Sequence, residues 1–172
     1  MSEPQARLFT ALWPDPAARR ALAVWQAQWQ WPPQARPTPP EQLHLTLHFL
    51  GALPAARIEA LGDALAQRAA PAVAPFELQL DRAEVWPRGL AVLCPAAPPP
   101  ALAALHAAQA ATLLRLGLQP ETRPYRPHLT LARQAAGAVP PAAPPALRWP
   151  VQDTVLVASV DGYRVLGRYR LG

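Results

Sequence analysis

The tetrapeptide His-Leu-Thr-Leu occurs twice in this chain, at residues 44–47 and again at 128–131. Histidine has an unperturbed pKa of about 6.5, so its ring gives or takes a proton near neutral pH. A threonine hydroxyl donates a hydrogen bond to a developing negative charge. Two copies of each side chain therefore suit acid–base chemistry on a phosphate ester, provided that both copies reach one place. Otherwise the repeat is a coincidence of strand-forming residues.

Each copy is typical of a β-strand with two different faces. Side chains alternate along a strand, and residues two apart lie about 7 Å apart on the same face. His44, Thr46 and His48 share one face of the first copy, and His128 with Thr130 shares one face of the second. We expect the opposite faces, which are rich in leucine, to pack into the core. The histidine faces would then meet across a groove between two related halves of the molecule.

The other two histidines fit this site less well. His48 has no counterpart in the second copy, where Ala132 occupies the matching position. We therefore expect His48 at the rim of the groove and not among the catalytic groups. His106 falls in a predicted helix away from both copies, and we expect it on the surface.

Composition restricts the class of protein. The chain has 172 residues, all 16 of its basic residues are arginine, and its formal net charge is +5. That charge favours an anionic partner such as nucleic acid, because the planar guanidinium binds phosphate bidentately. No signal-peptide pattern and no apolar run of about 18 residues is present, so we expect no membrane contact and a cytoplasmic location. Cys94 is the single cysteine and is predicted to be a small buried hydrophobe.

The hydrophobic pattern predicts the element order β-α-β-α-β-β-α-β-β-β. Several neighbouring strands read as hairpins, which favours an α+β fold with antiparallel sheets. A helix capped by Asp15 is expected to bury Ala18, Leu22, Trp25 and Trp29 as a core stripe. We expect strands up to Pro14 and at 42–49, 76–87, 90–94, 127–132, 154–160 and 163–171, helices after Asp15 and at 55–69 and 100–116, and proline-rich loops at 31–40 and 134–150.

Paired His-x-Thr strands with these flanks resemble the 2H phosphoesterase superfamily, and within it the bacterial RNA 2′,3′-cyclic phosphodiesterases, also called 2′-5′ RNA ligases. The resemblance implies a single domain over residues 1–172, built of two pseudo-symmetric lobes around a central cleft. Each lobe would contribute one His-Leu-Thr-Leu strand, and helices would flank the antiparallel sheets. The matching segments cover most of the chain: "RLFTALWP", "HLTLHFLG", "FELQLDRAEVWPRGLAVLC", "RPYRPHLTLAR" and "VLVASVDGYRVLGRYRL".

The resemblance also implies an activity. A 2′,3′-cyclic phosphate at an RNA end, with tRNA fragments among the candidates, would be hydrolysed to a 2′-phosphate by a monomer without metal or cofactor. A weak 2′-5′ RNA ligase activity would accompany it. His44 and His128 match the catalytic positions, and Thr46 and Thr130 match the phosphate-binding positions. We expect His44 as the acid toward the 3′ oxygen and His128 as the base toward water, although the reverse assignment stays open because the sequence does not orient the substrate.

Three residues around the second motif are further candidates for substrate binding. Arg133 stands at the family's arginine position, which implies contact with a phosphate or a base. Strict alternation puts it on the leucine face, so we expect a strand end or a bulge at 132–133. Tyr125 and Arg126 precede the motif and are expected to help hold the nucleotide.

Three alternatives remain at this point. A metal site at His44 and His48 is disfavoured, because the two residues lie about 13 Å apart along a strand. The chain could instead bind RNA ends without catalysis, although both motifs are intact. It could also act on small cyclic nucleotides or on 2′-5′ oligoadenylate, which turnover of a mononucleotide would reveal.

Overall fold

The computed structural model describes residues 6–67 and 72–172. Three helices and ten strands are present in this part of the chain. None of these helices is long and apolar enough to cross a bilayer. The elements are β1 Arg7–Leu12, α1 Pro16–Gln26, β2 Arg36–Pro37, β3 Leu45–Ala52, α2 Ala55–Ala66, β4 Phe76–Leu78, β5 Arg82–Trp86, β6 Leu90–Cys94, α3 Pro100–Arg115, β7 Leu129–Arg133, β8 Trp149–Val151, β9 Asp153–Ser159 and β10 Tyr163–Arg170.

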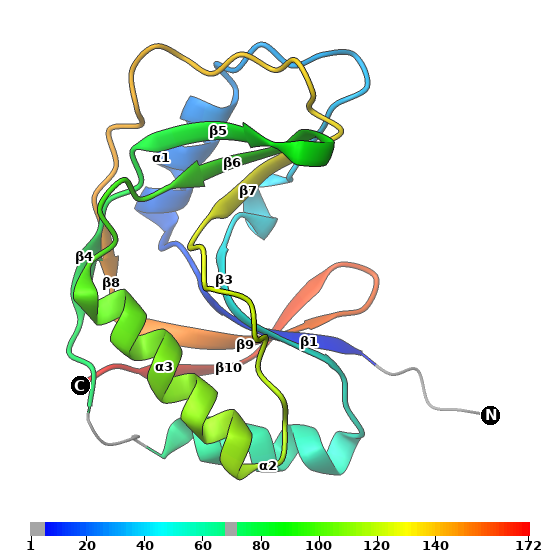
Figure 1. Ribbon diagram of the computed structural model, residues 1–172, viewed down its shortest axis with the longest axis vertical. Helices are drawn as coiled ribbons and strands as arrows, with labels where there is room; N and C mark the ends of the chain where they lie inside the picture. The colour runs from blue at the N-terminus through cyan, green and yellow to red at the C-terminus, as the bar shows by residue number, and fades with distance from the viewer. Residues whose placement is uncertain (1–5, 68–71) are drawn as a thin grey trace.

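One large sheet runs through the molecule in the order β10-β9-β1-β3-β7-β6-β5, with β2 added alongside β7. A second sheet contains only β4 and β8. Every pairing between the described strands is antiparallel, which confirms the predicted α+β class. Helix α1 lies beside β5, β6 and β7, whereas α2 and α3 lie together next to β9 and β10 (Figure 1).

The two His-Leu-Thr-Leu segments are neighbours at the centre of this sheet. Strand β3 pairs with β7 through Leu45 and Leu129, which are the same residue of the two copies. Each strand also carries a register shift one residue after its threonine, at Leu47 against β1 and at Leu131 against β6. The two strands consequently show the same order of burial from their first leucine onward: buried, half-buried, buried, buried, exposed.

Helix α1 and the core stripe of side chains that follows it form as predicted. The carboxylate of Asp15 accepts a hydrogen bond from the backbone N–H of Ala18 at 2.7 Å, which caps α1. Leu22, Trp25 and Trp29 are all buried, together with leucines of β3, β6 and β7. The tryptophan stripe is therefore core packing and not a surface for base stacking.

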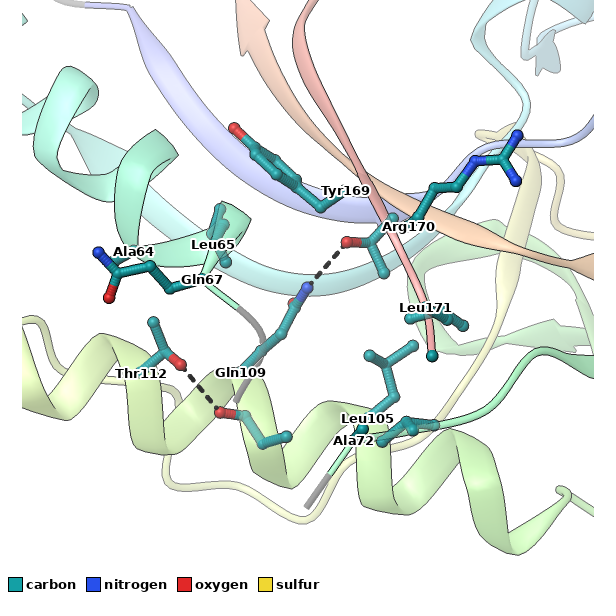
Figure 2. A pocket seen from close by; sticks show the side chains of 14 residues that line it. Ala64, Leu65, Gln67, Ala72, Leu105, Gln109, Thr112, Tyr169, Arg170 and Leu171 are labelled. Atoms are coloured by element: carbon teal, nitrogen blue, oxygen red, sulfur yellow. Dashed lines mark hydrogen bonds between the residues drawn. The ribbon is translucent and has the colours of Figure 1, made fainter. Parts of the chain in front are cut away.

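Hydrogen bonds of one side chain join helix α3 to strands β1 and β9 of the large sheet. Gln109 of α3 is buried; its amide oxygen accepts from the Thr10 hydroxyl at 2.9 Å and its amide nitrogen donates to the Thr154 hydroxyl at 3.2 Å. Figure 2 shows this side chain in a small cavity of about 70 Å³ between α2, α3 and β10. The side chain fixes α3 against β1 and β9, because a buried amide without partners would be costly.

Three segments differ from the predicted elements. The strand expected at 76–87 is two strands, since β4 leaves the main sheet to pair with β8, while β5 pairs with β6. Between them the Asp81 carboxylate accepts from the backbone N–H of Ala96 at 2.7 Å, which holds the chain at the crossing point. The two proline-rich loops contribute β2 and β8, strands of two and three residues that are too short for any periodic pattern. The strands expected at 154–160 and 163–171 pair as a hairpin, with Asp161 and Gly162 in its turn.

Gly89 holds the turn between β5 and β6 against the segment that follows β7. Its φ of 71° is in the left-handed region, and an added Cβ would lie 2.8 Å and 2.9 Å from the backbone nitrogens of Ala136 and Ala135. We expect Gly89→Ala to destabilise the protein by about 3 kcal/mol in urea unfolding, from backbone strain plus a clash that no side chain can relieve. Gly117→Ala is the matched control, because Gly117 has a φ of 70° and open space around it. An equal loss in both variants would show that the close approach at Gly89 does not matter.

Candidate active site

A cavity of about 720 Å³ opens on one face of the large sheet. His44, Thr46, His128 and Thr130 all line it, so the structure brings both repeated motifs to one place. Arginine and aromatic side chains surround these four residues. They are Arg7, Phe9, Arg36, Phe49, Arg133 and Tyr163.

The pairing of Leu45 with Leu129 sets the geometry of the four residues. In an antiparallel pair, extending the register by one residue places His44 level with Thr130, and Thr46 level with His128. Residues level with each other have Cβ atoms about 4.5–5.5 Å apart, and diagonal neighbours lie about 7–8 Å apart. The two histidines are such a diagonal pair. This separation leaves room for one phosphoryl group between the two rings.

The register shifts decide which later side chains reach the cavity. Leu47 has no partner on β1, so alternation is inverted after it: Phe49 faces the cavity and His48 faces the opposite side. The prediction that His48 lies at the cavity rim is therefore wrong. It is buried, with 3% of its surface exposed.

The same inversion in β7 brings Arg133 to the cavity. Leu131 has no partner on β6, so Arg133 lies on the face of Thr130 and lines the cavity. The expected bulge exists, but it lies at Leu131, one residue earlier than predicted. Arg133 thus occupies the position in β7 that Phe49 occupies in β3.

The two imidazoles are held in the same way. The Nδ1 atom of His44 lies 2.6 Å from the carbonyl oxygen of Gln42, and that of His128 lies 2.7 Å from the carbonyl oxygen of Arg126. A carbonyl only accepts, so Nδ1 carries the proton in both rings and Nε2 is the nitrogen left for chemistry. In His44 this Nε2 accepts from the Thr46 hydroxyl at 3.0 Å.

Both rings are set among aromatic side chains. His44 stacks on Phe9 and Trp13 at 4.8 Å and 5.5 Å between ring centroids, and His128 lies 4.6 Å from Trp86. Burial lowers the pKa of both histidines below the ordinary value of 6.5, because it disfavours the charged ring. Nearby arginines lower the pKa further: Arg19 acts on His44, while Arg126 and Arg133 act on His128. In the free protein, both rings are mainly neutral at pH 7.

The other two substrate-binding candidates lie outside the cavity. The hydroxyl of Tyr125 donates to the backbone carbonyl of Thr46 at 3.0 Å, behind the strand, so Tyr125 supports the first motif. Arg126 is exposed and lies 4.2 Å over the ring of Trp86, the residue that packs on His128. Neither side chain lines the cavity of the two motifs, and their contact with a nucleotide stays a prediction.

His106 is not the surface residue that the sequence predicted. Its ring stacks between His48 and Tyr125, with centroids 4.1 Å and 3.9 Å away. The Nε2 of His48 donates to the backbone carbonyl of His106 at 2.9 Å. Burial, followed by the charge of His48, lowers the pKa of His106 to about 4. These rings join α3 to the back of the first motif.

Two further cavity residues, Arg36 and Phe49, carry no signal in the sequence. Arg36 lies in a proline-rich segment without strand pattern, and unbroken alternation puts Phe49 on the core face. A bulge leaves no mark in a single sequence, and a strand of two residues has no period. Neither residue could therefore be found from periodicity. Among the described residues, no three His, Cys, Asp or Glu side chains cluster as a metal site requires.

Comparison with known proteins agrees with this architecture. Residues 13–164 match the 2′-5′ RNA ligase superfamily. A protein of Escherichia coli K12 named RNA 2′,3′-cyclic phosphodiesterase is 38% identical over 154 residues, which cover 87% of this chain and 82% of that protein. One of the same name from Thermus thermophilus is 35% identical over 169 residues, which cover 89% of this chain and 81% of that protein.

Solved structures show the same fold. The crystal structure of E. coli LigT complexed with 3′-AMP superimposes with a TM-score of 0.83 at 32% identity, covering 98% of this chain and 99% of that one. The chain therefore belongs to the 2′-5′ RNA ligase superfamily, as the paired motifs indicated.

Tyr125 offers a test of how the first motif is held. Tyr125→Phe removes the hydrogen bond to the Thr46 carbonyl and keeps the stacking on His106. We expect a loss of about 1 kcal/mol in the free energy of unfolding, since the carbonyl is left without this donor. Tyr169→Phe is the matched control, because the Tyr169 hydroxyl makes no hydrogen bond with the described residues, and it should change stability by less than about 0.5 kcal/mol. Equal effects in the two variants would contradict the supporting role of Tyr125.

Proposed function

We propose that this protein hydrolyses the 2′,3′-cyclic phosphate at an RNA end to a 2′-phosphate, by acid–base catalysis with His44 and His128. The observation that carries the proposal is the pairing of Leu45 with Leu129, because it brings both histidines and both threonines to one cavity. The names of the two relatives support this substrate, and the complex of E. coli LigT with 3′-AMP supports a nucleotide as the ligand.

The proposed step transfers two protons. Water attacks the phosphorus atom while Nε2 of His128 removes its proton. The bond between phosphorus and the 3′ oxygen breaks, and Nε2 of His44 protonates that oxygen. Each ring then exchanges its proton with solvent, so the neutral base and the protonated acid are restored. The chain supplies no metal or cofactor in this scheme.

The neutral residues of the site complement the histidines. When the substrate binds, the Thr46 hydroxyl turns from Nε2 of His44 to the phosphoryl oxygens. Together with the Thr130 hydroxyl it donates to these oxygens, where negative charge increases in the transition state. A bound phosphate also raises the pKa of both imidazoles, because the anion stabilises the charged ring. This effect offsets the burial that lowers the pKa in the free protein, and so allows His44 to carry the proton that an acid needs.

Other parts of the expectation stay predictions. We propose that residues 1–172 form one domain of two related lobes, supported by the shared register, bulge and histidine contacts of the two motifs. The superfamily's description favours a second activity, 2′-5′ ligation, in which a 5′-hydroxyl replaces water as the nucleophile at the same phosphorus and the same 3′ oxygen leaves. A monomer in the cytoplasm remains the prediction from the sequence.

Replacing either catalytic candidate tests the proposal. We expect His44→Ala and His128→Ala each to reduce kcat for a cyclic-phosphate-ended oligonucleotide by about 10²- to 10⁴-fold. The double variant should fall far short of the product of the two losses, since both groups serve one step. His106→Gln is the control histidine, and it should stay within about tenfold of the unaltered protein. Full hydrolysis by a folded single variant would overturn the assignment.

A substrate with sulfur at the 3′ position separates the two roles within the same experiment. A thiolate leaves without a proton, so the loss in His44→Ala should shrink on the 3′-thio cyclic phosphate, whereas the loss in His128→Ala should persist. The opposite pattern would exchange the acid and the base.

A further inference from the structure

A tryptophan and an arginine hold the surroundings of the His44 ring. Trp13 stacks on His44 with 5.5 Å between the ring centroids. The guanidinium carbon of Arg19 lies 5.3 Å from the centroid of the Trp13 ring, within the range of cation–π attraction. Arg19 also donates from Nη1 to the carbonyl of Pro40, in the short turn whose Gln42 carbonyl fixes the Nδ1 proton of His44. Arg19 therefore contacts both the residue stacked on the ring and the turn that sets its tautomer.

The ring of His128 has the same two kinds of neighbour. Trp86 lies 4.6 Å from His128, and the guanidinium carbon of Arg126 lies 4.2 Å from the centroid of the Trp86 ring. The indole Nε1 of Trp86 donates to the carboxylate of Glu84 at 2.5 Å, which fixes the orientation of the tryptophan. The carbonyl that holds the Nδ1 proton of His128 belongs to Arg126 itself. One arginine thus contacts the packing tryptophan and fixes the carbonyl at this ring too.

Neither core packing nor ion pairing explains these contacts. Trp13 and Trp86 are half-buried, and Arg126 is exposed. Within the part of the chain that the structure describes, neither Arg19 nor Arg126 forms an ion pair with a carboxylate. Nη2 of Arg19 is buried without a hydrogen-bond partner among the described residues, which costs free energy. The chain holds this cation near His44 at a cost in stability, as functional sites do.

Each imidazole faces a different arginine. The titratable groups that face His44 come from three elements: Arg19 of α1, His128 of β7 and Tyr163 of β10. The charged groups that act on His128 are Arg126, which precedes β7, and Arg133 at the end of β7. After burial, the charge of Arg19 lowers the pKa of His44 and that of Arg126 lowers the pKa of His128, because a nearby cation disfavours a second positive charge.

We propose that Arg19 and Arg126 are positioning residues of the reaction, each of which holds the tryptophan and the carbonyl of one histidine and so aims its Nε2 at the shared phosphorus atom. The positive charge of each arginine also disfavours a proton on that ring before a phosphate binds. This inference rests on the proposed function. Neither arginine lines the cavity of the two motifs, so this role requires no contact with the substrate.

NMR titration of the imidazole nitrogens in the free protein tests each arginine separately. We expect Arg19→Gln to raise the pKa of His44 and to increase the share of its neutral ring that is protonated on Nε2, with little change at His128. Arg126→Gln should raise the pKa of His128 and leave that of His44. Arg19→Lys should keep most of the lowered pKa of His44, because lysine retains the charge. Arg20→Gln is the matched control, since Arg20 is the exposed neighbour in the same helix, and it should change neither ring.

A double-variant cycle connects each arginine to catalysis. We expect Arg19→Gln to lower kcat for a cyclic-phosphate-ended oligonucleotide by about tenfold, because Nε2 of His44 is then less well directed. KM should change by less than about twofold, whereas loss of a contact with the substrate would raise it. In the His44→Ala background the same change should cause no further loss, since the ring through which Arg19 acts is absent. Arg126→Gln should behave in the same way with His128→Ala.

Three results would overturn the inference. They are an unchanged pKa and tautomer of His44 in Arg19→Gln, an equal shift at both histidines, and a full loss of kcat from Arg19→Gln in the His44→Ala background. Failure of the unaltered protein to hydrolyse the oligonucleotide would overturn the proposed function, and the role of the arginines in catalysis with it. The titration separates these failures, because it requires no substrate.

Discussion

The antiparallel pairing of Leu45 with Leu129 is the contact on which the site depends. It joins the same residue of two identical tetrapeptides, so the side chains that one strand presents to the cavity are presented by the other from the opposite direction. His44 lies diagonally across from His128, and Thr46 lies diagonally across from Thr130. Two imidazoles and two hydroxyls therefore line one cavity. A slip of one residue would turn both sets of side chains to the other face of the sheet. The buried leucines of both strands prevent such a slip, because it would expose them.

The bulges at Leu47 and Leu131 bring different side chains of β3 and β7 into the cavity. After Leu47 and Leu131 the alternation inverts, and the side chains that enter the cavity are Phe49 from one strand and Arg133 from the other. The reacting centre is nearly symmetric, whereas its surroundings are aromatic toward one end and doubly basic toward the other. Such a cavity presents different side chains to the two ends of a bound substrate. This asymmetry gives the two chemically similar histidines different partners and allows them to take different roles.

Burial and backbone contacts set the pKa and the tautomer of the two imidazoles. A carbonyl two residues upstream fixes the Nδ1 proton of each ring, and aromatic neighbours exclude water from its faces. The pKa of both groups falls in the free protein because burial outweighs the carbonyl contact, which raises it, and an anion between the two rings would raise it again. In the proposed reaction, protonation of His44 would thereby be linked to substrate binding. Behind the strand, the stacked rings of His48, His106 and Tyr125 carry the first motif on α3.

The sequence predicted the elements with a repeated or periodic pattern. The capped helix at Asp15, the tryptophan stripe, the terminal hairpin and the meeting of the two motifs were all accessible, because each depends on local propensity or on an exact repeat. The bulge positions were not, since a bulged leucine looks like any other leucine of the pattern and only the residues after it change face. His48 was misplaced and Phe49 was missed for this reason. Arg36 was missed because its strand has only two residues. His106 was misplaced because its partners are distant in sequence.

The most direct test is whether the rings of His44 and His128 share one phosphate. Their pKa values can be measured by NMR titration of the imidazole nitrogens, with and without a saturating nucleoside 2′-phosphate. Both rings should titrate below 6.5 in the free protein, with the proton of the neutral form on Nδ1. Both pKa values should rise together when the phosphate binds, because one anion lies between the two rings. A rise at only one ring, or at neither, would show that the two motifs do not flank a common phosphorus atom.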